Sequence, residues 1–379
     1  MERGAGAGAA GGWIFLSAGE PSGDRHAARV ARELGARRPD LKLVGLGGPA
    51  MAAAGVELVA GLEDLAVMGY AEVARRLPFF LSLRRRVWRT LATRDVRLVL
   101  PVDYPGFNLP LARRAHASGI PVLYFIAPQV WAWREGRARR LAETCDRVLT
   151  VLPFEHDRLR EHGVDAYFVG HPLLDEPAAG HGGGSRPRAS SGPLLGLFPG
   201  SRVQEVERML PVFAAAARRL ARSHPEMEIL VARPPHLPAD SYEPYGIDTA
   251  AAAEVLARAT TAITKSGTIT LELALAGTPM VVGYRTSALT YALARRVVKV
   301  PSIALVNLVA GERIVPELVQ EDLTEDALVR ACAPLLEAGG PEAARLRRAL
   351  GELQARLGEP GCARRVAEQA LQLLGPPVG

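Results

Sequence analysis

An arginine at the start of a predicted helix is the first feature of this sequence that suggests chemistry. In the segment FPGSRVQEVE, residues 198–207, an apolar run gives way to a turn at Gly200 and to a helix with Ser201 as its N-cap. Gln204 stands three residues after Ser201, which is the spacing of a capping box. Amides and the positive dipole end of such a helix attract anions, and Arg202 would oppose that dipole unless an anion lay nearby. The segment therefore predicts a phosphate site, against the plainer alternative of an ordinary helix start.

A second glycine loop leads from an apolar run into another predicted helix. Ser266, Gly267 and Thr268 form the loop, and Glu272 stands one turn into the helix. A carboxylate at that place lies beside whatever the loop binds and can accept hydrogen bonds from both hydroxyls of a ribose. Read alone, Glu272 would be a surface residue favoured by the helix dipole. Together with the loop, it is predicted to bind ribose.

Polar residues also follow the apolar runs of the first half of the chain. Asp103 ends the run that begins at Leu98, and Trp131 and Trp133 follow the next run. The segment SAGEPSGDRH supplies residues expected to face a ligand or to cap a helix: Ser17, Gly19, Glu20, Ser22, Gly23, Asp24 and His26. These side chains are expected at the carboxyl ends of strands, where ligands of α/β proteins bind.

Metal and nucleophilic motifs find little support in the sequence. It contains no Asp-x-Asp pair, no HExxH, no Gly-x-Ser-x-Gly elbow and no Walker A segment. His156 and His162, six residues apart, would point to different helical faces. Residues 45–55, GLGGPAMAAAG, resemble a dinucleotide fingerprint only weakly because the spacing is wrong. We therefore expect neither a metal ion nor another cofactor.

Short apolar runs alternate with helical periodicity throughout the chain. Strands are expected at 13–19, 41–47, 96–103, 122–128, 147–153 and 166–170, and again at 194–198, 228–232, 261–266 and 279–284. Helices in the second half are expected at 203–223, 250–259 and 268–277. Such alternation predicts an α/β fold with two Rossmann-like domains, each with a parallel, doubly wound sheet. A ligand cleft is expected between the carboxyl ends of the two sheets.

Glycine, proline and serine mark the expected domain boundaries. Residues 1–11 predict a flexible tail and 176–193 a linker, because both segments lack periodicity. The first domain is then 12–175 and the second 194–350. Residues 351–379 are expected to form a C-terminal helix that packs on the first domain of its own chain or of a partner.

Composition places the chain among globular proteins. Of its 379 residues, 48% are hydrophobic and 23% charged, which excludes disordered and fibrous classes. Three widely spaced cysteines favour a reducing, intracellular compartment, and no run approaches the roughly 18 apolar residues of a membrane span. A net charge of +6 suggests an anionic partner.

One basic segment stands apart from the other arginine-rich helices. Residues 75–91 combine six arginines with five large apolar side chains, namely Phe79, Phe80, Leu81, Leu83 and Trp88. A surface helix that meets a membrane and an amphipathic core helix explain this pattern equally well.

The motifs taken in order resemble a known family. SAGEPSGD, DLAVMGYAEV, DYPGFN, PQVWAWR, VLPFE, VGHPL, PGSRVQEVE, SGTITLELAL, GTPMVVGYR and LVNLVAGERIVPELVQ, between about Trp13 and Gln320, are similar to the lipid-A-disaccharide synthases, glycosyltransferase family 19. The resemblance implies a GT-B fold and an inverting transfer of 2,3-diacylglucosamine from its UDP donor. The acceptor would be the 6-hydroxyl of 2,3-diacylglucosamine 1-phosphate, and the products a β-1,6-linked disaccharide and UDP.

The resemblance also implies partners and a location. The enzyme would act without a metal on the cytoplasmic face of the bacterial inner membrane, in contact with its lipids and not with nucleic acid. Members of the family can exchange C-terminal helices, which makes a homodimer an expectation here.

Roles for individual residues follow from the same resemblance. Asp103 is expected to be the general base, with Glu20 or His26 as the substitutes, and Arg202 to neutralise the departing diphosphate. Further substrate contacts are expected from Asn108, Gln129, Tyr284, Asn307, Glu312 and Gln320. The chain departs from the family in the short stretch 232–249, which puts the uridine-side loop in doubt. Lys265 is also unusual, and would either contact phosphate or face solvent.

Two other functions are compatible with parts of the sequence. A UDP-N-acetylglucosamine 2-epimerase would use the same ribose glutamate and phosphate loop. A non-catalytic binder of lipid or nucleic acid is favoured only by the charge, and donor-dependent release of UDP would exclude it.

Overall fold

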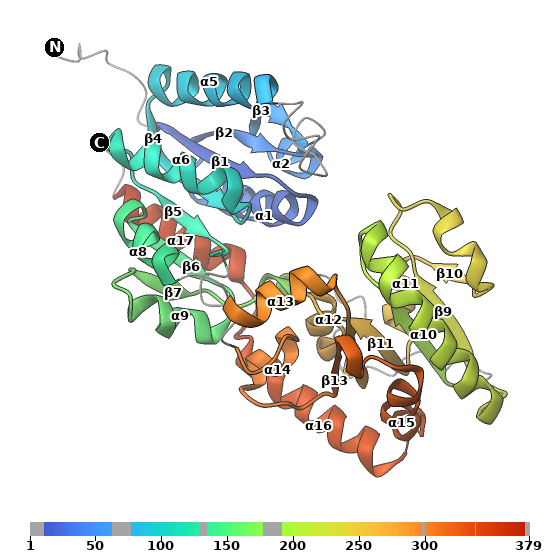
Figure 1. Cartoon of the computed structure of the whole chain (residues 1–379). Coiled ribbons are helices and arrows are strands. Elements are labelled where there is room, and N and C mark those ends of the chain that lie inside the picture. The colour runs from blue at the N-terminus through green and yellow to red at the C-terminus, as the bar shows by residue number, and fades with distance from the viewer. Residues whose placement is uncertain are drawn as a thin grey trace, which may run out of the picture. The chain divides into compact units, whose positions relative to one another are not determined.

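The computed structural model describes residues 11–62, 77–128, 135–176, 192–297, 300–337 and 339–375. These residues form two compact units (Figure 1). The first unit comprises residues 1–175 and 359–379, and the second comprises residues 176–358. Most of the predicted tail and linker, together with Gln129, Trp131 and Trp133, lies outside the described residues.

The first unit is built on a seven-stranded sheet in the order β3-β2-β1-β4-β5-β6-β7, in which every pairing is parallel. The strands are β1 (Trp13–Ala18), β2 (Lys42–Gly47), β3 (Glu57–Gly61), β4 (Val96–Val102), β5 (Leu123–Phe125), β6 (Arg147–Thr150) and β7 (Ala166–Phe168). The strand order reverses between β1 and β4, where Ala18 pairs with Val102. This is the topological switch point, at which α/β sheets bind their ligands.

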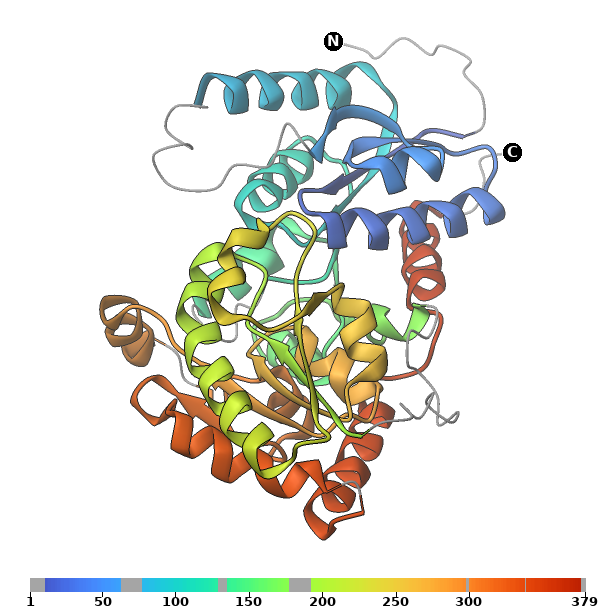
Figure 2. The ribbon, with the colours of Figure 1, turned by 90° about the vertical axis from the view of Figure 1, so that its right-hand side faces the viewer.

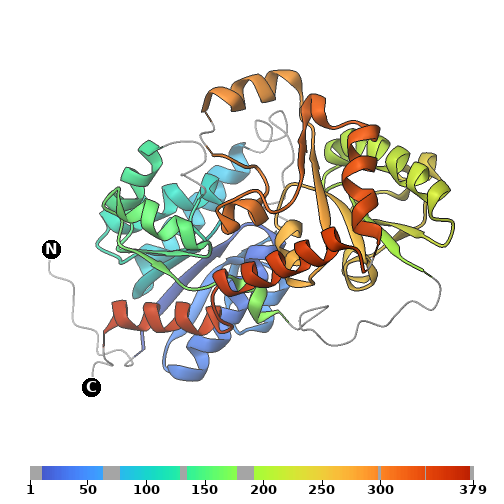
Figure 3. The same ribbon diagram turned by 90° about the horizontal axis from the view of Figure 1, so that it is seen from below.

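The helices of the first unit bury apolar faces on this sheet. They are α1 (Pro21–Arg37), α2 (Pro49–Ala53), α5 (Leu77–Thr93), α6 (Pro105–Ala117), α8 (Glu135–Thr144), α9 (Pro153–Arg160), the 3₁₀ turn η1 (Pro172–Asp175) and α17 (Cys362–Leu374). Phe15, Tyr124 and Val148 are fully buried in the core between these layers. The C-terminal helix α17 lies against α1 (Figure 3), and the Asp175 carboxylate accepts hydrogen bonds from its first backbone amides.

The second unit repeats the design with a six-stranded parallel sheet in the order β10-β9-β8-β11-β12-β13. Its strands are β8 (Leu194–Phe198), β9 (Glu228–Ala232), β10 (Thr249–Ala250), β11 (Thr261–Lys265), β12 (Met280–Tyr284) and β13 (Glu317–Val319). Here the switch point lies between β8 and β11, where Phe198 pairs with Thr264. Both glycine loops singled out in the sequence therefore begin at neighbouring strand ends.

The helices of the second unit are α10 (Val203–Ser223), α11 (Ala252–Arg258), α12 (Ile269–Leu275), α13 (Ala288–Val297), α14 (Leu305–Ala310), α15 (Glu325–Leu336) and α16 (Pro341–Arg356). Three 3₁₀ turns, η2 (Ala239–Ser241), η3 (Glu243–Tyr245) and η4 (Gln320–Asp322), complete it. The long helix α10, yellow-green in Figure 2, contacts β8 and α15 and buries Phe213 and Leu220.

The prediction of two parallel, doubly wound sheets is confirmed, with two differences in detail. Strands β3, β10 and β13 were not predicted; each lies at a sheet edge, and β10 and β13 have only two and three residues. The second unit also continues past residue 350 to Gly358. Leu350, Leu353 and Leu357 are buried and prolong the apolar stripe of α16, so Gly351 does not end the helix.

Helix α5 contains most of the basic segment 75–91, for which a membrane-surface helix and an amphipathic core helix were both expected. Leu83 and Val87 are fully buried, and Phe79 and Trp88 pack against the core of the first unit. The two aromatic side chains are therefore partly buried, and the inner face of α5 is that of an amphipathic core helix. Its outer face carries exposed arginines, and Leu81 is 44% exposed. Among the described residues, no helix combines the length and the apolar character needed to cross a bilayer.

Candidate functional site

The carboxyl ends of β1 and β4 bring two carboxylates to the switch point of the first unit. Glu20 is the N-cap of α1, and Asp103 follows β4 directly. Asp103 and Tyr104 are both in the left-handed backbone region, with φ of 47° and 50°. A Cβ at Gly19 would come within 2.2 Å of the Tyr104 ring, so the close approach of these two loops requires glycine there.

The surroundings of Asp103 make its carboxylate a better proton acceptor. Burial, the largest cause, and the negative charge of Glu20 raise the pKa of the Asp103 carboxyl above its usual value, while a hydrogen bond from the Tyr104 backbone amide acts in the opposite direction. A carboxylate with a raised pKa binds a proton more readily at neutral pH. The predicted base therefore has the electrostatic environment that the role requires.

The main chain of Asp103 is held by neighbouring residues. Its amide donates to the Phe125 carbonyl at 2.9 Å. Its carbonyl accepts hydrogen bonds from the Tyr124 hydroxyl at 2.8 Å and from Asn108 Nδ2 at 2.7 Å. Asn108 Oδ1 in turn accepts from the Ser17 hydroxyl at 2.6 Å. Ser17 and Asn108, both predicted to contact substrate, are buried and use these polar groups inside the protein.

Asp24 has a structural role rather than the predicted one. Its carboxylate is 3% exposed and accepts backbone hydrogen bonds from Gly48 at 2.7 Å, Ala50 at 3.0 Å and Met51 at 3.1 Å. It therefore caps α2, which begins at Pro49, instead of its own helix or a ligand. In the same segment, Ser22 is exposed and Gly23 is buried.

His26 is poorly suited to replace Asp103 as the base. Burial, the largest cause, and the positive charges of Arg29 and Arg25 together lower the pKa of His26 to about 4, while the negative charge of Asp175 acts in the opposite direction. The neighbouring His171 is also buried, which lowers its pKa to about 3. With its lowered pKa, His26 loses the advantage as a base near neutral pH that an ordinary imidazole has. Glu20, which lies beside Asp103 at the same switch point, is the substitute that the position favours.

In the second unit, the first glycine loop differs from the predicted capping box. Helix α10 begins at Val203 with Arg202 as N-cap, and no side chain caps it in the predicted manner. Glu205 takes the place expected for Gln204, because its carboxylate accepts the Ser201 amide at 2.9 Å. A Cβ at Gly200 would come within 2.4 Å of that carboxylate. The Arg202 side chain is exposed at the loop.

The two glycine loops are joined by an ion pair. Lys265 Nζ lies 2.8 Å from Glu205 Oε1, and both side chains are largely buried. Burial would raise the pKa of Glu205, but the hydrogen bond and charge of Lys265, together with the Ser201 amide and the charge of Arg202, lower it below its usual value. The Lys265 ammonium group is thus paired with Glu205 and does not simply face solvent, and its expected phosphate contact stays a prediction.

The second glycine loop is also fixed by hydrogen bonds. The Ser266 hydroxyl donates to the Ile303 carbonyl at 2.7 Å, and the Thr270 hydroxyl donates to the Gly267 carbonyl at 2.8 Å. Thr268 is exposed at the N-cap of α12, and Glu272 is half-buried on that helix. Ser266 and Gly267 are also partly exposed, so each of the four residues of this motif keeps some exposed surface.

Two residues predicted for the donor site hold the backbone instead. Asn307 is buried and bonds to Glu317, to the Val315 carbonyl and to the Ile314 amide. Gln320 has a φ of 55° and accepts the Thr286 amide at 2.6 Å. Their amide groups are occupied because each closes an irregular segment whose backbone needs partners. Glu312 is exposed and Tyr284 is half-buried at the end of β12.

His236 is a neighbour of the first loop that the sequence did not indicate. Its Nε2 donates to the Ser201 carbonyl at 2.9 Å. It comes from the poorly patterned stretch 232–249, whose lack of periodicity gave no signal for it. That stretch therefore reaches the predicted phosphate loop.

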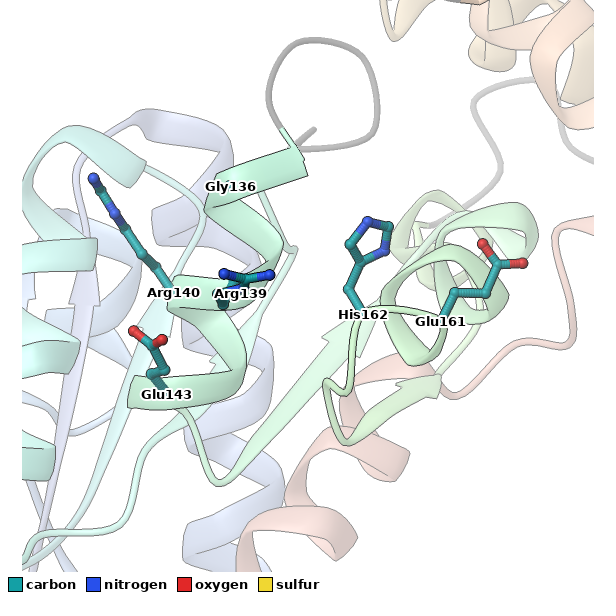
Figure 4. A pocket seen from close by; sticks show the side chains of 6 residues that line it. All are labelled: Gly136, Arg139, Arg140, Glu143, Glu161 and His162. Atoms are coloured by element: carbon teal, nitrogen blue, oxygen red, sulfur yellow. The ribbon is translucent and has the colours of Figure 1, made fainter.

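A pocket of about 740 Å³ lies elsewhere in the first unit, between α8 and the end of α9 (Figure 4). Its described lining is Gly136, Arg139, Arg140, Glu143, Glu161 and His162. Charges of both signs line it, and none of these residues was predicted for the site. Within the described ranges, no group of three or more His, Cys, Asp or Glu residues could hold a metal ion.

Comparisons with known proteins indicate one family. The profile of a family described as lipid-A-disaccharide synthetase matches residues 14–356. A lipid-A-disaccharide synthase of Anaeromyxobacter sp. (strain K) is 42% identical, covering 95% of this chain and 97% of that protein. One of Myxococcus xanthus (strain DK1622) is 39% identical, covering 96% and 98%.

Solved structures resemble the chain in fold. A glycotransferase of kitacinnamycin has a TM-score of 0.65 at 18% identity, covering 96% of this chain and all of that one. A UDP-N-acetylglucosamine 2-epimerase from Listeria monocytogenes, described with reservation as to its activity, has a TM-score of 0.63 at 13% identity, covering 94% and 95%. The expected GT-B fold is confirmed, and these likenesses say nothing further about the reaction.

Proposed function

The chain belongs to the lipid-A-disaccharide synthetase family, and from that premise we propose how its residues divide the work of the reaction. The enzyme joins 2,3-diacylglucosamine from a UDP donor to the 6-hydroxyl of 2,3-diacylglucosamine 1-phosphate. The products are the β-1,6-linked lipid A disaccharide 1-phosphate and UDP. This reaction needs a base that takes the proton of the acceptor hydroxyl and positive groups that stabilise the departing diphosphate.

Asp103 is the base in this proposal. Its carboxylate takes the proton of the 6-hydroxyl while that oxygen attacks C1 of the donor sugar on the face opposite UDP. The C1–O bond to UDP breaks as the new bond forms, so the configuration at C1 inverts. The observation that carries this assignment is the place of Asp103 at the switch point beside Glu20, with burial and that second charge raising its pKa.

The donor is assigned to the two loops of the second unit. Arg202 and the loop amides bear the charge of the departing diphosphate, Thr268 lies beside the phosphates, and Glu272 accepts from the ribose hydroxyls. The ion pair of Lys265 with Glu205 supports this assignment because it fixes the spacing of the two loops. Positive groups of the chain thereby do what a metal ion does in other transferases.

An epimerase is the alternative on the same fold, and the relatives do not favour it. The two functions separate in one assay, because an epimerase converts its UDP-sugar without a lipid acceptor. We expect the purified chain to form the disaccharide from both lipid substrates in excess chelator, with one UDP released for each product. Loss of product in chelator with rescue by magnesium would refute metal independence, and turnover of donor alone would favour the epimerase.

We also assign the outer face of α5 to contact with the inner membrane. Three exposed arginines, Arg84, Arg85 and Arg89, stand on this face near the exposed Leu81. Basic side chains near a membrane surface are attracted by anionic lipid phosphates, and salt weakens that attraction.

The homodimer stays a prediction, since the described α17 packs on α1 of its own chain.

Vesicle binding tests the α5 assignment. A variant with Arg84→Ser, Arg85→Ser and Arg89→Ser should lose most of its cosedimentation with vesicles that contain anionic lipid, and the wild-type chain should lose the same binding as salt rises. The matched control removes three exposed arginines of α10 by Arg208→Ser, Arg218→Ser and Arg222→Ser. Equal losses in both variants would mean that net charge, and not α5, governs binding.

A further inference from the structure

Strained backbone is concentrated at two neighbouring strand ends of the first unit. Asp103 and Tyr104 follow β4 with φ of 47° and 50°, and Ile126 follows β5 with φ of 60°. Residues with a Cβ seldom adopt the left-handed region, and a β-branched residue such as isoleucine does so least readily. Such conformations persist only where neighbouring groups hold them, and they cluster at functional sites.

Two buried side chains donate hydrogen bonds to the same backbone carbonyl of this strained turn. The Tyr124 hydroxyl and Asn108 Nδ2 both donate to the Asp103 carbonyl, at 2.8 Å and 2.7 Å. Tyr124 is fully buried on β5, and burial raises its pKa well above the usual value, so its hydroxyl remains a proton donor. Asn108 is fully buried on α6 and is itself fixed by the Ser17 hydroxyl at 2.6 Å.

We infer that Tyr124 is a positioning residue for the reaction, which acts with Asn108 to hold Asp103 in its left-handed conformation and so to aim the carboxylate. Both hydrogen bonds are accepted by the backbone carbonyl of Asp103. They therefore fix the position of its main chain, from which the side chain extends, and leave its carboxylate available to substrate. This inference rests on the proposed role of Asp103 as the base.

The hydroxyl of Tyr124 can be removed without disturbing the core. In Tyr124→Phe the ring keeps its packing, but one of the two donors to the Asp103 carbonyl is lost and the turn can relax. We expect kcat to fall about 10-fold or more, because small displacements of a catalytic group are costly to rate. The KM for the donor should stay within about 2-fold, since the predicted donor loops belong to the second unit.

The pH profile gives a readout that lost stability alone would not move. The groups that face Asp103 are Glu20 at the start of α1, its neighbour Tyr104, and Tyr124 from β5. Burial and Glu20 raise the pKa of Asp103. A relaxed turn exposes the carboxylate to water and lowers that pKa, so the acid limb of the kcat/KM profile of Tyr124→Phe should move to lower pH.

A stability control comes from the same core. Val44 is fully buried in the core cluster that contains Tyr124, but it lies on β2 and has no part in the turn. Val44→Ala should lower the melting temperature and keep both kcat and the acid limb of the wild-type enzyme. The inference is overturned if Tyr124→Phe keeps kcat within about 2-fold of the wild type, or if Val44→Ala reproduces its kinetic change.

A double variant separates this inference from the assignment of the base. If Tyr124 acts through Asp103, Tyr124→Phe should slow Asp103→Asn no further. An additional 10-fold loss in the double variant would overturn the positioning role and leave Asp103 as the base. Near-normal turnover of Asp103→Asn itself would instead remove the base assignment, and the inference would fall with it.

Discussion

Replacing Arg202 by methionine should lower kcat/KM for the donor on the order of 100-fold, and the melting temperature should stay level or rise slightly. Arg202 is exposed as the N-cap of α10, at the loop assigned to the diphosphate. Methionine keeps much of the length of the side chain and removes its charge and its donors. A positioned donor that bears a developing negative charge is typically worth that much in rate.

The opposite signs of the two effects make this prediction specific. A positive charge at a helix N-terminus opposes the dipole, so its removal favours the helix by a few tenths of a kcal/mol if nothing else changes. A purely structural Arg202 would therefore give a variant that is no less stable and fully active. Arg208→Met, which removes an exposed arginine farther along α10, is the matched control. Equal kinetics for the two variants, with equal UDP affinity by calorimetry, would exclude Arg202 from the donor site.

The elements of the fold could be predicted because apolar periodicity records which residues face a core. The runs at Trp13, Val96 and Leu194 all begin observed strands. Strands β13 and β10 could not be predicted because runs of three and two residues are too short to show an alternating pattern of apolar residues. The expected end of the second unit at residue 350 lies inside α16, which continues to Arg356, so the unit extends to Gly358.

The candidate site was predictable as a set of loops, but not in its internal contacts. The sequence shows that a polar residue follows a strand, but it does not show whether the side chain contacts a ligand or forms hydrogen bonds with main-chain groups. Asn108, Asn307 and Gln320 all bond to main-chain groups that irregular turns leave unpaired. Glu205, and not Gln204, receives the Ser201 amide, and that choice depends on side-chain reach in three dimensions.

Tyr124 shows a different limit. It stands inside an apolar run, where a tyrosine is most simply interpreted as a core residue, and its ring is indeed fully buried. Its hydroxyl meets the carbonyl of a residue 21 positions earlier in the chain. Only the pairing of β4 with β5 brings these atoms together, so no local pattern could have revealed the contact.

Asp103→Asn is the second substitution for which we expect a large effect, and the backbone conformation of Asp103 is compatible with asparagine. Asparagine occupies the left-handed backbone region about as readily as aspartate, so the strained turn should be kept. The amide preserves the shape of the side chain but cannot take a proton from the acceptor hydroxyl. We expect kcat to fall on the order of 100-fold or more, with little change in the affinity for UDP.

A structural role for Asp103 predicts the reverse pattern. If the carboxylate only stabilised the turn that contains Tyr104, its loss would cost about 1 kcal/mol of stability and little turnover. The raised pKa of Asp103 gives a further difference. The acid limb of the wild-type kcat/KM profile should lie above the usual aspartate pKa of about 3.9, because the base is inactive once protonated.

The most direct test of Asp103 as the base is therefore one set of measurements on Asp103→Asn beside the wild-type chain: kcat for disaccharide formation, UDP affinity and melting temperature. If Asp103 is the base, kcat should fall about 100-fold or more while UDP affinity and melting temperature stay nearly unchanged. Near-normal turnover would contradict it and would transfer the role of base to Glu20, the other carboxylate at the same switch point.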